Sequence, residues 1–386
     1  MIDSRPFGLL LNPRHGVPGV IVLPAGGFRR ARAAITAWPG YAPTPLHDLP
    51  NIAPGVAVLR IKDESGRFGL GSFKALGGAY AVAALLSGDL SRRGLALSAS
   101  AEALADGRYR DATESITVTC ATDGNHGRSV AWGAQRFHCR CVIFVHETVS
   151  QGRMDAIAAY GAEVVRVPGT YDDAVREADR RARTEGWFVV SDTSYPGYTE
   201  VPRDVMQGYR QMADEAADQW SGPPPTHVFM QAGVGGAAAA VSVQIRARFG
   251  SAPLLVVVEP EQAACLFASA LAGAATAVGG SLDTIMAGLA CGEPSLLAWQ
   301  ELERAAFAFM TIPDAAAVGT MRLLADAGLY IGESGVAGLA ALLLAAQDAE
   351  ARAKLRLDAA SKVLCFGTEG VTDSFLYQIL LGLHSR

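Results

Sequence analysis

The stretch KDESGRFGLGSFKALGG, residues 62 to 78, places one lysine, Lys74, between Phe73 and Ala75 among apolar residues and glycines. The chain has four lysines, at positions 62, 74, 354 and 362, although Lys and Arg together number 33. Arginine therefore supplies most of the positively charged side chains of this protein. The use of lysine at position 74 indicates a need for a primary amine.

A primary amine can do chemistry that a guanidinium cannot. Burial lowers the pKa of a lysine, and the neutral amine can form a Schiff base or take a proton. The alternative is a helix lysine whose stem packs on apolar surface while its head reaches water. The arginine bias of the chain favours the chemical interpretation of Lys74.

The composition describes a globular protein of two domains. The chain has 386 residues, 50% of them hydrophobic, and a net charge of -5. A negative balance argues against nucleic-acid binding, which needs a basic face. No apolar stretch approaches the ~18 residues that span a bilayer, and no secretion signal is recognisable, so no membrane association and a cytoplasmic location are expected. Six scattered cysteines indicate buried thiols and no metal site, with a Cys265 to Cys291 disulfide left open.

The pattern of hydrophobic residues predicts an α/β protein with parallel-rich sheets flanked by helices. Short apolar runs alternate with segments of helical spacing, which is typical of parallel sheets covered on both faces. The runs expected to be strands begin near residues 56, 116, 141, 162, 187, 226, 254 and 362, and VAGLAALLLAA at 336 to 346 is expected to be a buried helix. In such sheets, ligands bind at the carboxyl ends of strands.

The segment THVFMQAGVGGAAAA, residues 226 to 240, reads as a strand, a glycine turn and a helix of small residues. Backbone amides of Gly233, Val234, Gly235 and Gly236 at a helix N-terminus would bind a phosphate group. The same loop matches G-x-G-x-x-A, and Glu259 ends the next strand, so a nicotinamide dinucleotide site is a competing interpretation.

Two further strand ends carry polar residues. ATDGNHG, residues 121 to 127, offers free amides at a helix N-terminus that suit a carboxylate or an anionic oxygen, although Asp123 or Asn125 could simply cap the helix. SDTSYPGYTE, residues 191 to 200, offers Asp192 followed by Tyr195 and Tyr198, and here a plain turn is the alternative.

The combination resembles the fold type II pyridoxal-phosphate enzymes, and within them the 2,3-diaminopropionate ammonia-lyases. The segments that carry the resemblance are KDES-x-RFGL-x-x-FK-x-LGG at 62 to 78, ATDGNHGR at 121 to 128, DT-x-x-x-GYT at 192 to 199, IMAGLACGEPS at 285 to 295 and ESG at 333 to 335. They occur in the family's order across about residues 55 to 375.

The resemblance implies a role for each matching residue. Lys74 would be the Schiff-base lysine, with Phe73 and Asn125 beside the pyridoxal phosphate, Gly233 to Gly236 on its phosphate and Thr368 at its pyridine nitrogen. Thr122, Gly124, His126 and Tyr198 would bind the amino-acid substrate. Asp123 would be a second base facing Lys74, and Asp192 would lie on the side of the β-amino group.

The resemblance further implies an α,β-elimination that converts 2,3-diaminopropionate to pyruvate and two ammonia, with the L form as substrate and the D form as a second candidate substrate. It implies a homodimer, a large cofactor-binding domain of residues 1–80 and 196–386, and a smaller mobile domain of residues 81–195. A dehydratase or lyase acting on serine, threonine or another β-substituted amino acid is the nearest alternative. A nicotinamide-dependent oxidoreductase and a non-catalytic ligand sensor are the alternatives from other classes.

Overall fold

The computed structural model describes residues 7–122 and 124–382. The chain divides into two compact units, which we describe separately. Unit 1 consists of Met1–Val22, Pro43–Ser72 and Met212–Arg386, and unit 2 of Leu23–Ala42 and Phe73–Gln211. One division point lies within helix α8 (Glu200–Gln219). Both units are α/β, as predicted.

Unit 1 contains a seven-stranded sheet in the order β1-β10-β9-β8-β11-β3-β2. The strands are β1 (Gly8–Leu11), β2 (Leu46–Asp48), β3 (Val58–Asp63), β8 (His227–Gln231), β9 (Leu254–Pro260), β10 (Ala306–Ile312) and β11 (Lys362–Gly367). The five inner strands are parallel, while the edge strands β1 and β2 pair antiparallel with β10 and β3. The carboxyl ends of the parallel strands therefore lie along one edge of the sheet.

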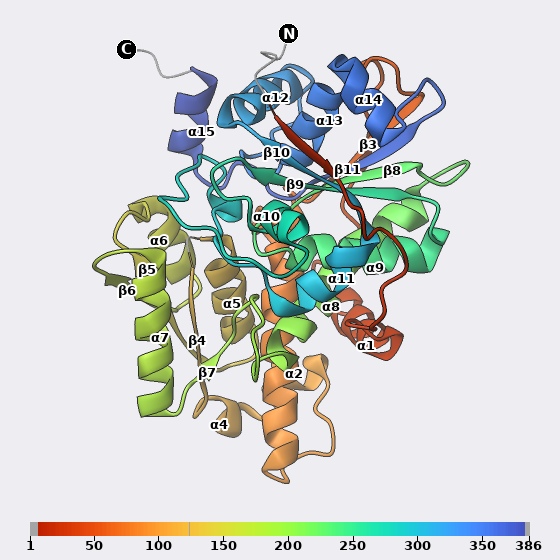
Figure 1. Cartoon of the computed structure of the whole chain (residues 1–386). Coiled ribbons are helices and arrows are strands. Elements are labelled where there is room, and N and C mark those ends of the chain that lie inside the picture. The colour runs from red at the N-terminus through yellow and green to blue at the C-terminus, as the bar shows by residue number, and fades with distance from the viewer. Residues whose placement is uncertain (1–6, 123, 383–386) are drawn as a thin grey trace. The chain divides into compact units, whose positions relative to one another are not determined.

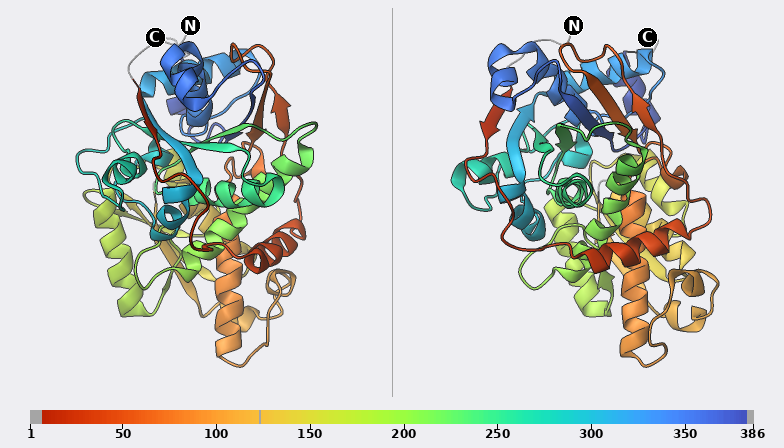
Figure 2. Two further views of the ribbon diagram at one scale, coloured as in Figure 1. Left: turned by 45° about the vertical axis from the view of Figure 1, so that its right-hand side comes forward. Right: turned by 90° about the vertical axis from the view of Figure 1, so that its right-hand side faces the viewer.

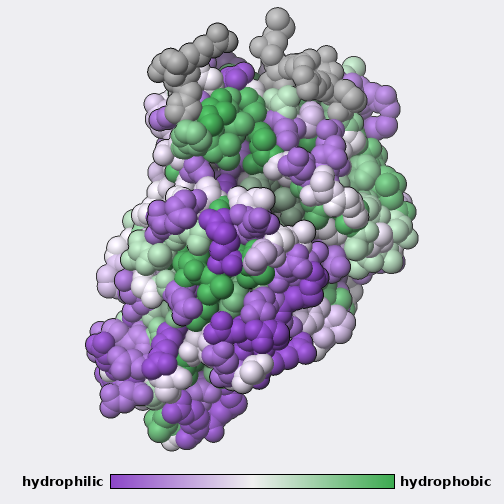
Figure 3. Space-filling view, turned by 90° about the vertical axis from the view of Figure 1, so that its left-hand side faces the viewer, coloured by the Kyte–Doolittle hydropathy of each residue, from purple (hydrophilic) through white to green (hydrophobic). Residues whose placement is uncertain are grey.

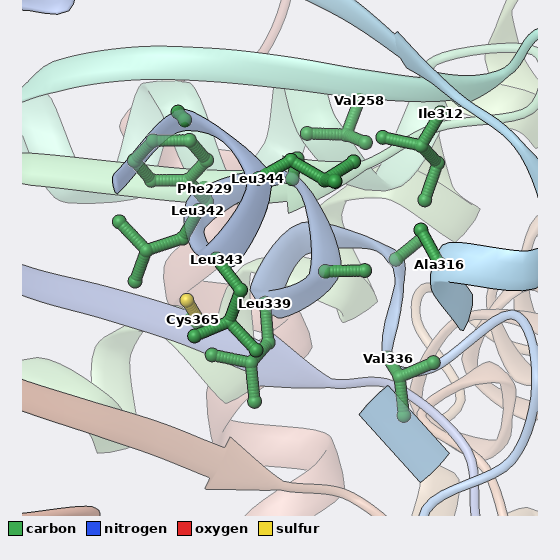
Figure 4. Packing of buried hydrophobic residues seen from close by; sticks show 14 of the residues in the cluster. Phe229, Val258, Ile312, Ala316, Val336, Leu339, Leu342, Leu343, Leu344 and Cys365 are labelled. Atoms are coloured by element: carbon green, nitrogen blue, oxygen red, sulfur yellow. The ribbon is translucent and has the colours of Figure 1, made fainter. Parts of the chain in front are cut away.

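Helices cover both faces of this sheet, with α12 to α14 on one face and α9 to α11 on the other (Figures 1 and 2). They are α9 (Gly236–Phe249), α10 (Cys265–Ala272), α11 (Leu296–Ala305), α12 (Asp314–Asp326), α13 (Ala337–Gln347), α14 (Ala349–Leu355) and α15 (Ser374–Leu381), with short 3-10 turns at Arg67–Gly69 and Ala287–Leu289. Helix α13 is the predicted buried helix, and its leucines pack among Phe229, Val258, Ile312 and Cys365 (Figure 4).

Unit 2 contains a four-stranded, fully parallel sheet in the order β6-β5-β4-β7. Its strands are β4 (Thr117–Ala121), β5 (Arg140–His146), β6 (Glu163–Val167) and β7 (Phe188–Val189). Its helices are α1 (Ala25–Thr36), α2 (Lys74–Arg92), α3 (Ala101–Ala105), α4 (Arg110–Thr113), α5 (Asn125–Arg136), α6 (Gln151–Ala158), α7 (Tyr171–Glu185) and the first part of α8. Helix α7 is rich in exposed Arg to acid pairs, and much of the surface on its side of the molecule is hydrophilic (Figure 3).

All eight expected strands are present, but three others were not expected from the sequence. Strands β1 and β2 are short antiparallel edges of four and three residues; β1 pairs with the distant β10 and β2 with the next strand, β3. Strand β10, AFAFMTI, alternates alanine with larger residues, and alanine is a poor strand former. Tertiary pairing with β9 and β1 decides its conformation. No described helix has the length and apolar character that crossing a membrane requires.

Glycines allow the helices of unit 2 to approach closely around the start of α2. A Cβ on Gly78 would lie 2.5 Å from Ser129 Oγ on α5, and one on Gly133 would lie 2.7 Å from Ala79 Cα. Ser129 Oγ donates to the carbonyl of Lys74 (2.7 Å) and accepts from the amide of Ala79 (3.1 Å). The glycines after Lys74 therefore allow the first turn of α2 to pack closely against α5 and to form hydrogen bonds with Ser129.

The charged residues that precede Lys74 form a buried ionic network in unit 1. Arg67 donates to Glu64 Oε2 (2.8 Å) and to both carboxylate oxygens of Glu215 (2.9 and 2.7 Å). Lys62 Nζ lies 2.8 Å from Glu215 Oε2 and donates to the carbonyl of Thr44 (2.6 Å). All four ionised side chains are at most 3% exposed. Two cations and two carboxylates balance, so the KDES-x-R pattern is structural.

Replacement of Arg67 by Met should lower the free energy of unfolding by about 3–5 kcal/mol, because it leaves two buried carboxylates without their guanidinium. Urea and thermal unfolding of the purified protein measure the effect. The matched control is Arg110→Ala on the exposed pair with Glu114, at 60% and 52% exposure, which should change stability by less than about 1 kcal/mol. Equal effects of the two replacements would contradict a structural role for the network.

Candidate active site

Lys74 is the first residue of α2, and its amine lies in unit 2 next to a carboxylate. Lys74 Nζ pairs with Asp192 Oδ2, and the two side chains are 20% and 17% exposed. Aromatic rings flank the amine, with Nζ 5.5 Å from the ring centroid of Phe73 and 5.7 Å from that of Tyr209. The amine is thus partly buried and sits between an acid and two aromatic rings, which is the crowded setting predicted for it.

Asp192 lies in the loop that follows β7. Burial raises the pKa of its carboxyl, but the positive charge of Lys74, and then that of His126, outweigh burial and hold the pKa well below its ordinary value. Asp192 is therefore ionised at neutral pH. The hydroxyl of Tyr198 braces this loop, because it accepts from the amide of Ser191 (3.0 Å) and donates to the carbonyl of Val189 (2.9 Å).

His126, in the first turn of α5, lies on the other side of Asp192. Its Nε2 is 2.7 Å from the carbonyl oxygen of Val190. A carbonyl only accepts, so Nε2 carries a proton and Nδ1 is the nitrogen that faces Asp192 Oδ2, 3.9 Å away. The structure thereby brings three predicted residues together in the order Lys74, Asp192 and His126.

The loop before α5 is organised by Thr122. Its hydroxyl accepts hydrogen bonds from the amides of Gly124 (3.0 Å) and Gly127 (3.1 Å). Gly124 precedes the helix with φ +155°, and Asn125 begins the helix. Thr122, Gly124, Asn125 and His126 thus lie together at this helix N-terminus. Asp123, the predicted second base, lies outside the described residues.

The predicted phosphate loop belongs to unit 1, between β8 and α9. Gly235 adopts φ +94°, and a Cβ there would lie 3.0 Å from Ala298 Cβ, so only glycine fits. Within residues 7–122 and 124–382, the amides of Gly233 to Gly236 donate to no protein acceptor. Free amides at a helix N-terminus suit an anionic oxygen. This loop fits the phosphate of pyridoxal phosphate.

Thr368, also in unit 1, is held by a residue that the sequence did not single out. The buried Gln231 donates from Nε2 to Thr368 Oγ1 (2.7 Å) and to the carbonyls of Phe366 (2.8 Å) and Gly335 (2.9 Å). Because Thr368 Oγ1 accepts from Gln231, its own proton can be donated elsewhere, as a bond to a ring nitrogen requires. The sequence feature that could have identified Gln231 is the position of this polar residue at the end of the buried strand HVFMQ.

Glu259 does not serve a nucleotide. It is fully buried, and its two oxygens accept from the amides of Leu266 (2.8 Å) and Phe267 (2.7 Å) at the start of α10. Burial raises the pKa of Glu259 to about 8. The nicotinamide interpretation requires an acid that a ribose hydroxyl can reach, whereas Glu259 is fully buried and bonded to two helix amides. Cys265 and Cys291, for which a disulfide was left open, are not joined by a disulfide in this structure.

Each unit, taken by itself, therefore supplies groups that suit pyridoxal phosphate. Unit 2 supplies a partly buried primary amine and a helix N-terminus, and unit 1 supplies a glycine loop with free amides and a buried hydroxyl whose proton is available. These are the groups needed for an aldehyde, a carboxylate, a phosphate and a ring nitrogen.

Comparisons with known proteins agree with this chemistry. Residues 37–366 match the model of the family described as pyridoxal-phosphate dependent enzyme. The diaminopropionate ammonia-lyase of Escherichia coli (strain K12) is 42% identical over 348 residues, which are 86% of this chain and 86% of that protein.

Solved structures extend the similarity to nearly the whole chain. The selenomethionine-incorporated holo diaminopropionate ammonia lyase from Escherichia coli has a TM-score of 0.90 and 36% identity, covering 99% of this chain and 98% of that one. The Escherichia coli enzyme in complex with an aminoacrylate-PLP azomethine reaction intermediate has a TM-score of 0.87 over the same shares. The predicted family resemblance, fold class and cofactor are thus confirmed, and the chain belongs to the family of pyridoxal-phosphate dependent enzymes.

Proposed function

We propose that the protein catalyses the α,β-elimination of 2,3-diaminopropionate to pyruvate and two ammonia. The observation that carries the proposal is the ion pair between Lys74 and Asp192, flanked by His126. In this ion pair, an amine that can act as a base lies beside an ionised carboxylate. Similarity to the diaminopropionate ammonia-lyases supports the choice of substrate.

The role of each residue follows from its chemistry. The cofactor, when bound, accepts the electron pair that remains on Cα after its proton has been removed. Lys74 would hold the cofactor and would take the Cα proton of an L substrate, while Asp123 would take that of a D substrate. Gly233 to Gly236 bind the phosphate. The amides at the start of α5 bind the substrate carboxylate.

Asp192 selects the leaving group. Its carboxyl is ionised at neutral pH, so it attracts the positively charged β-ammonium group and keeps it protonated. The β-nitrogen can then depart as neutral ammonia. The hydroxyl of serine must gain a proton before it departs, and an ionised carboxylate has none to give. Asp192 therefore favours diaminopropionate over the dehydratase substrates.

Several coarser features complete the proposal. Phe73 lies against the cofactor, Asn125 and Thr368 bind its ring substituents, and Thr122 and Tyr198 shape the substrate side. We further propose that residues 1–80 and 196–386 act as the cofactor-binding domain and residues 81–195 as the smaller mobile domain; the compact units of the fold divide the chain elsewhere, after residues 22, 42, 72 and 211. We also propose a cytoplasmic homodimer that binds neither nucleic acid nor membranes. A non-catalytic sensor would have no use for the paired Lys74 and Asp192.

A panel of L and D amino acids tests the substrate. With pyridoxal phosphate present, 2,3-diaminopropionate should give a kcat/KM at least about a hundredfold above that of serine, because only its β-group carries a charge that Asp192 can bind. Pyruvate and ammonia are assayed together, and two ammonia per pyruvate identify diaminopropionate as substrate. Faster turnover of serine or threonine would establish the dehydratase alternative instead.

Replacement of Asp192 by Asn should lower kcat/KM for diaminopropionate by about 10²–10⁴-fold, because the amide keeps the shape but loses the charge. The residual activity toward serine, measured in the same variant, is the internal control and should fall much less. Loss of both activities by the same factor would show that Asp192 does not select the leaving group.

Replacement of Asp123 by Asn should abolish elimination from D-diaminopropionate and leave the L activity within about tenfold, since only the D substrate presents its Cα proton to this side. Separate assays with the two enantiomers measure the ratio. If the variant lost both activities in equal measure, the assignment of one base to each face would be wrong.

A further inference from the structure

Tyr209, on the part of α8 that belongs to unit 2, is a neighbour of Lys74 that neither the sequence nor the family resemblance had identified. Its side chain is 1% exposed. Its ring contacts that of Phe73, with centroids 4.6 Å apart, and its ring centroid lies 5.7 Å from Lys74 Nζ. Together with Asp192, these rings surround the amine.

Two glycines bring Tyr209 to this place. A Cβ on Gly77 would lie 2.3 Å from Tyr209 Cε1, and one on Gly208 would lie 2.2 Å from the carbonyl oxygen of Leu76. Distances this short exclude any side chain at either position. Helices α2 and α8 are therefore in close contact at this point, and the tyrosine ring lies flush against the first turn of the helix that carries Lys74.

The hydroxyl of Tyr209 is buried and forms no hydrogen bond of full geometry in the described part of the chain, but the Lys74 amine is close enough for a hydrogen-bonding contribution that lowers the pKa of the tyrosine. A buried polar group without a partner is destabilising, and the adjacent amine can supply one. Burial raises the pKa of Tyr209, and the positive charge of Lys74 lowers it by a smaller amount. The phenol therefore stays protonated at neutral pH and interacts electrostatically with the charged amine of Lys74.

The geometry points to a positioning role for Tyr209: we propose that its hydroxyl oxygen accepts a hydrogen bond from the Lys74 ammonium whenever Lys74 carries a proton. An ammonium has three N–H groups. Asp192 accepts one and Tyr209 accepts the second, and together they fix the direction of the third relative to the reacting atoms. In the described residues, Asp192 and Tyr209 are the titratable groups facing the amine, and His126 faces Asp192 from behind.

The role given to the third N–H rests on the proposed function, but the hydrogen bond does not. It can be tested on the full chain before pyridoxal phosphate is added. Because the chain has four lysines, labelling with ¹³C-lysine gives few side-chain NMR signals, and Lys74→Arg identifies the one from position 74. A hydrogen bond to the charged form favours that form. Tyr209→Phe should therefore move the titration midpoint of the Lys74 signal to lower pH.

Tyr377→Phe is the matched control. Tyr377, on α15 in unit 1, is also buried, and its hydroxyl has no hydrogen-bond partner among the described residues. This variant should leave the Lys74 titration unchanged. Tyr377→Phe should leave the melting temperature of the cofactor-free chain nearly unchanged, and Tyr209→Phe should lower it by no more than roughly a few degrees, because one hydrogen bond contributes little to the net stability of a chain of this length. A well-folded Tyr209→Phe protein with an unshifted Lys74 signal would overturn the proposal.

Kinetics of the cofactor-loaded enzyme give a second readout. Tyr209→Phe should lower kcat about tenfold with KM unchanged, because the substrate still binds but the amine is less well directed. A purely structural role would instead change stability or KM. If diaminopropionate proves not to be the substrate, the NMR titration still decides on the hydrogen bond. If the titration fails, the assignment of the substrate is unaffected.

Discussion

A lysine at the first position of a helix is in an unfavourable place, and the ion pair with Asp192 compensates for it. The N-terminal end of a helix carries partial positive charge, which repels an ammonium group. Partial burial adds to this cost, and the ring faces of Phe73 and Tyr209 offset part of it through cation–π contacts. Asp192 offsets the rest with its negative charge. The contact that stabilises this turn is thus the same one on which the proposed chemistry of Lys74 depends.

The charged residues of the opening segment divide into two roles. Lys62, Glu64 and Arg67 form a closed network in unit 1 with Glu215, in which every charge has a buried partner. Lys74, a few residues later, belongs to unit 2 and has a partner that lies 118 positions away. The contrast shows why a run of charges in a motif does not by itself mark a catalytic site. The network around Arg67 is buried and its charges cancel, so it stabilises the fold. The amine of Lys74 is partly exposed, so a ligand can reach it.

Sequence patterns found the elements whose signal is local. Apolar runs bounded by Gly, Pro or Asp identified eight strands and the loops after them, because buried parallel strands are apolar throughout and their loops are not. Strand β10 was missed because alanines obscure its pattern. Gln231 and Tyr209 were missed because their importance lies in contacts with residues more than 100 positions away, Thr368 for one and Lys74 for the other.

The sequence by itself determined the α/β class and the family, and it singled out the candidate lysine and the glycine loop, because each depends on a short run of residue types with a distinctive chemistry. Tertiary structure alone decided which groups face that lysine. Asp192 comes to it from the end of β7, His126 from the start of α5, and Tyr209 from α8 across Gly77. The pKa of a carboxyl and the direction of an amine depend on such neighbours, and neighbours in space are set by packing.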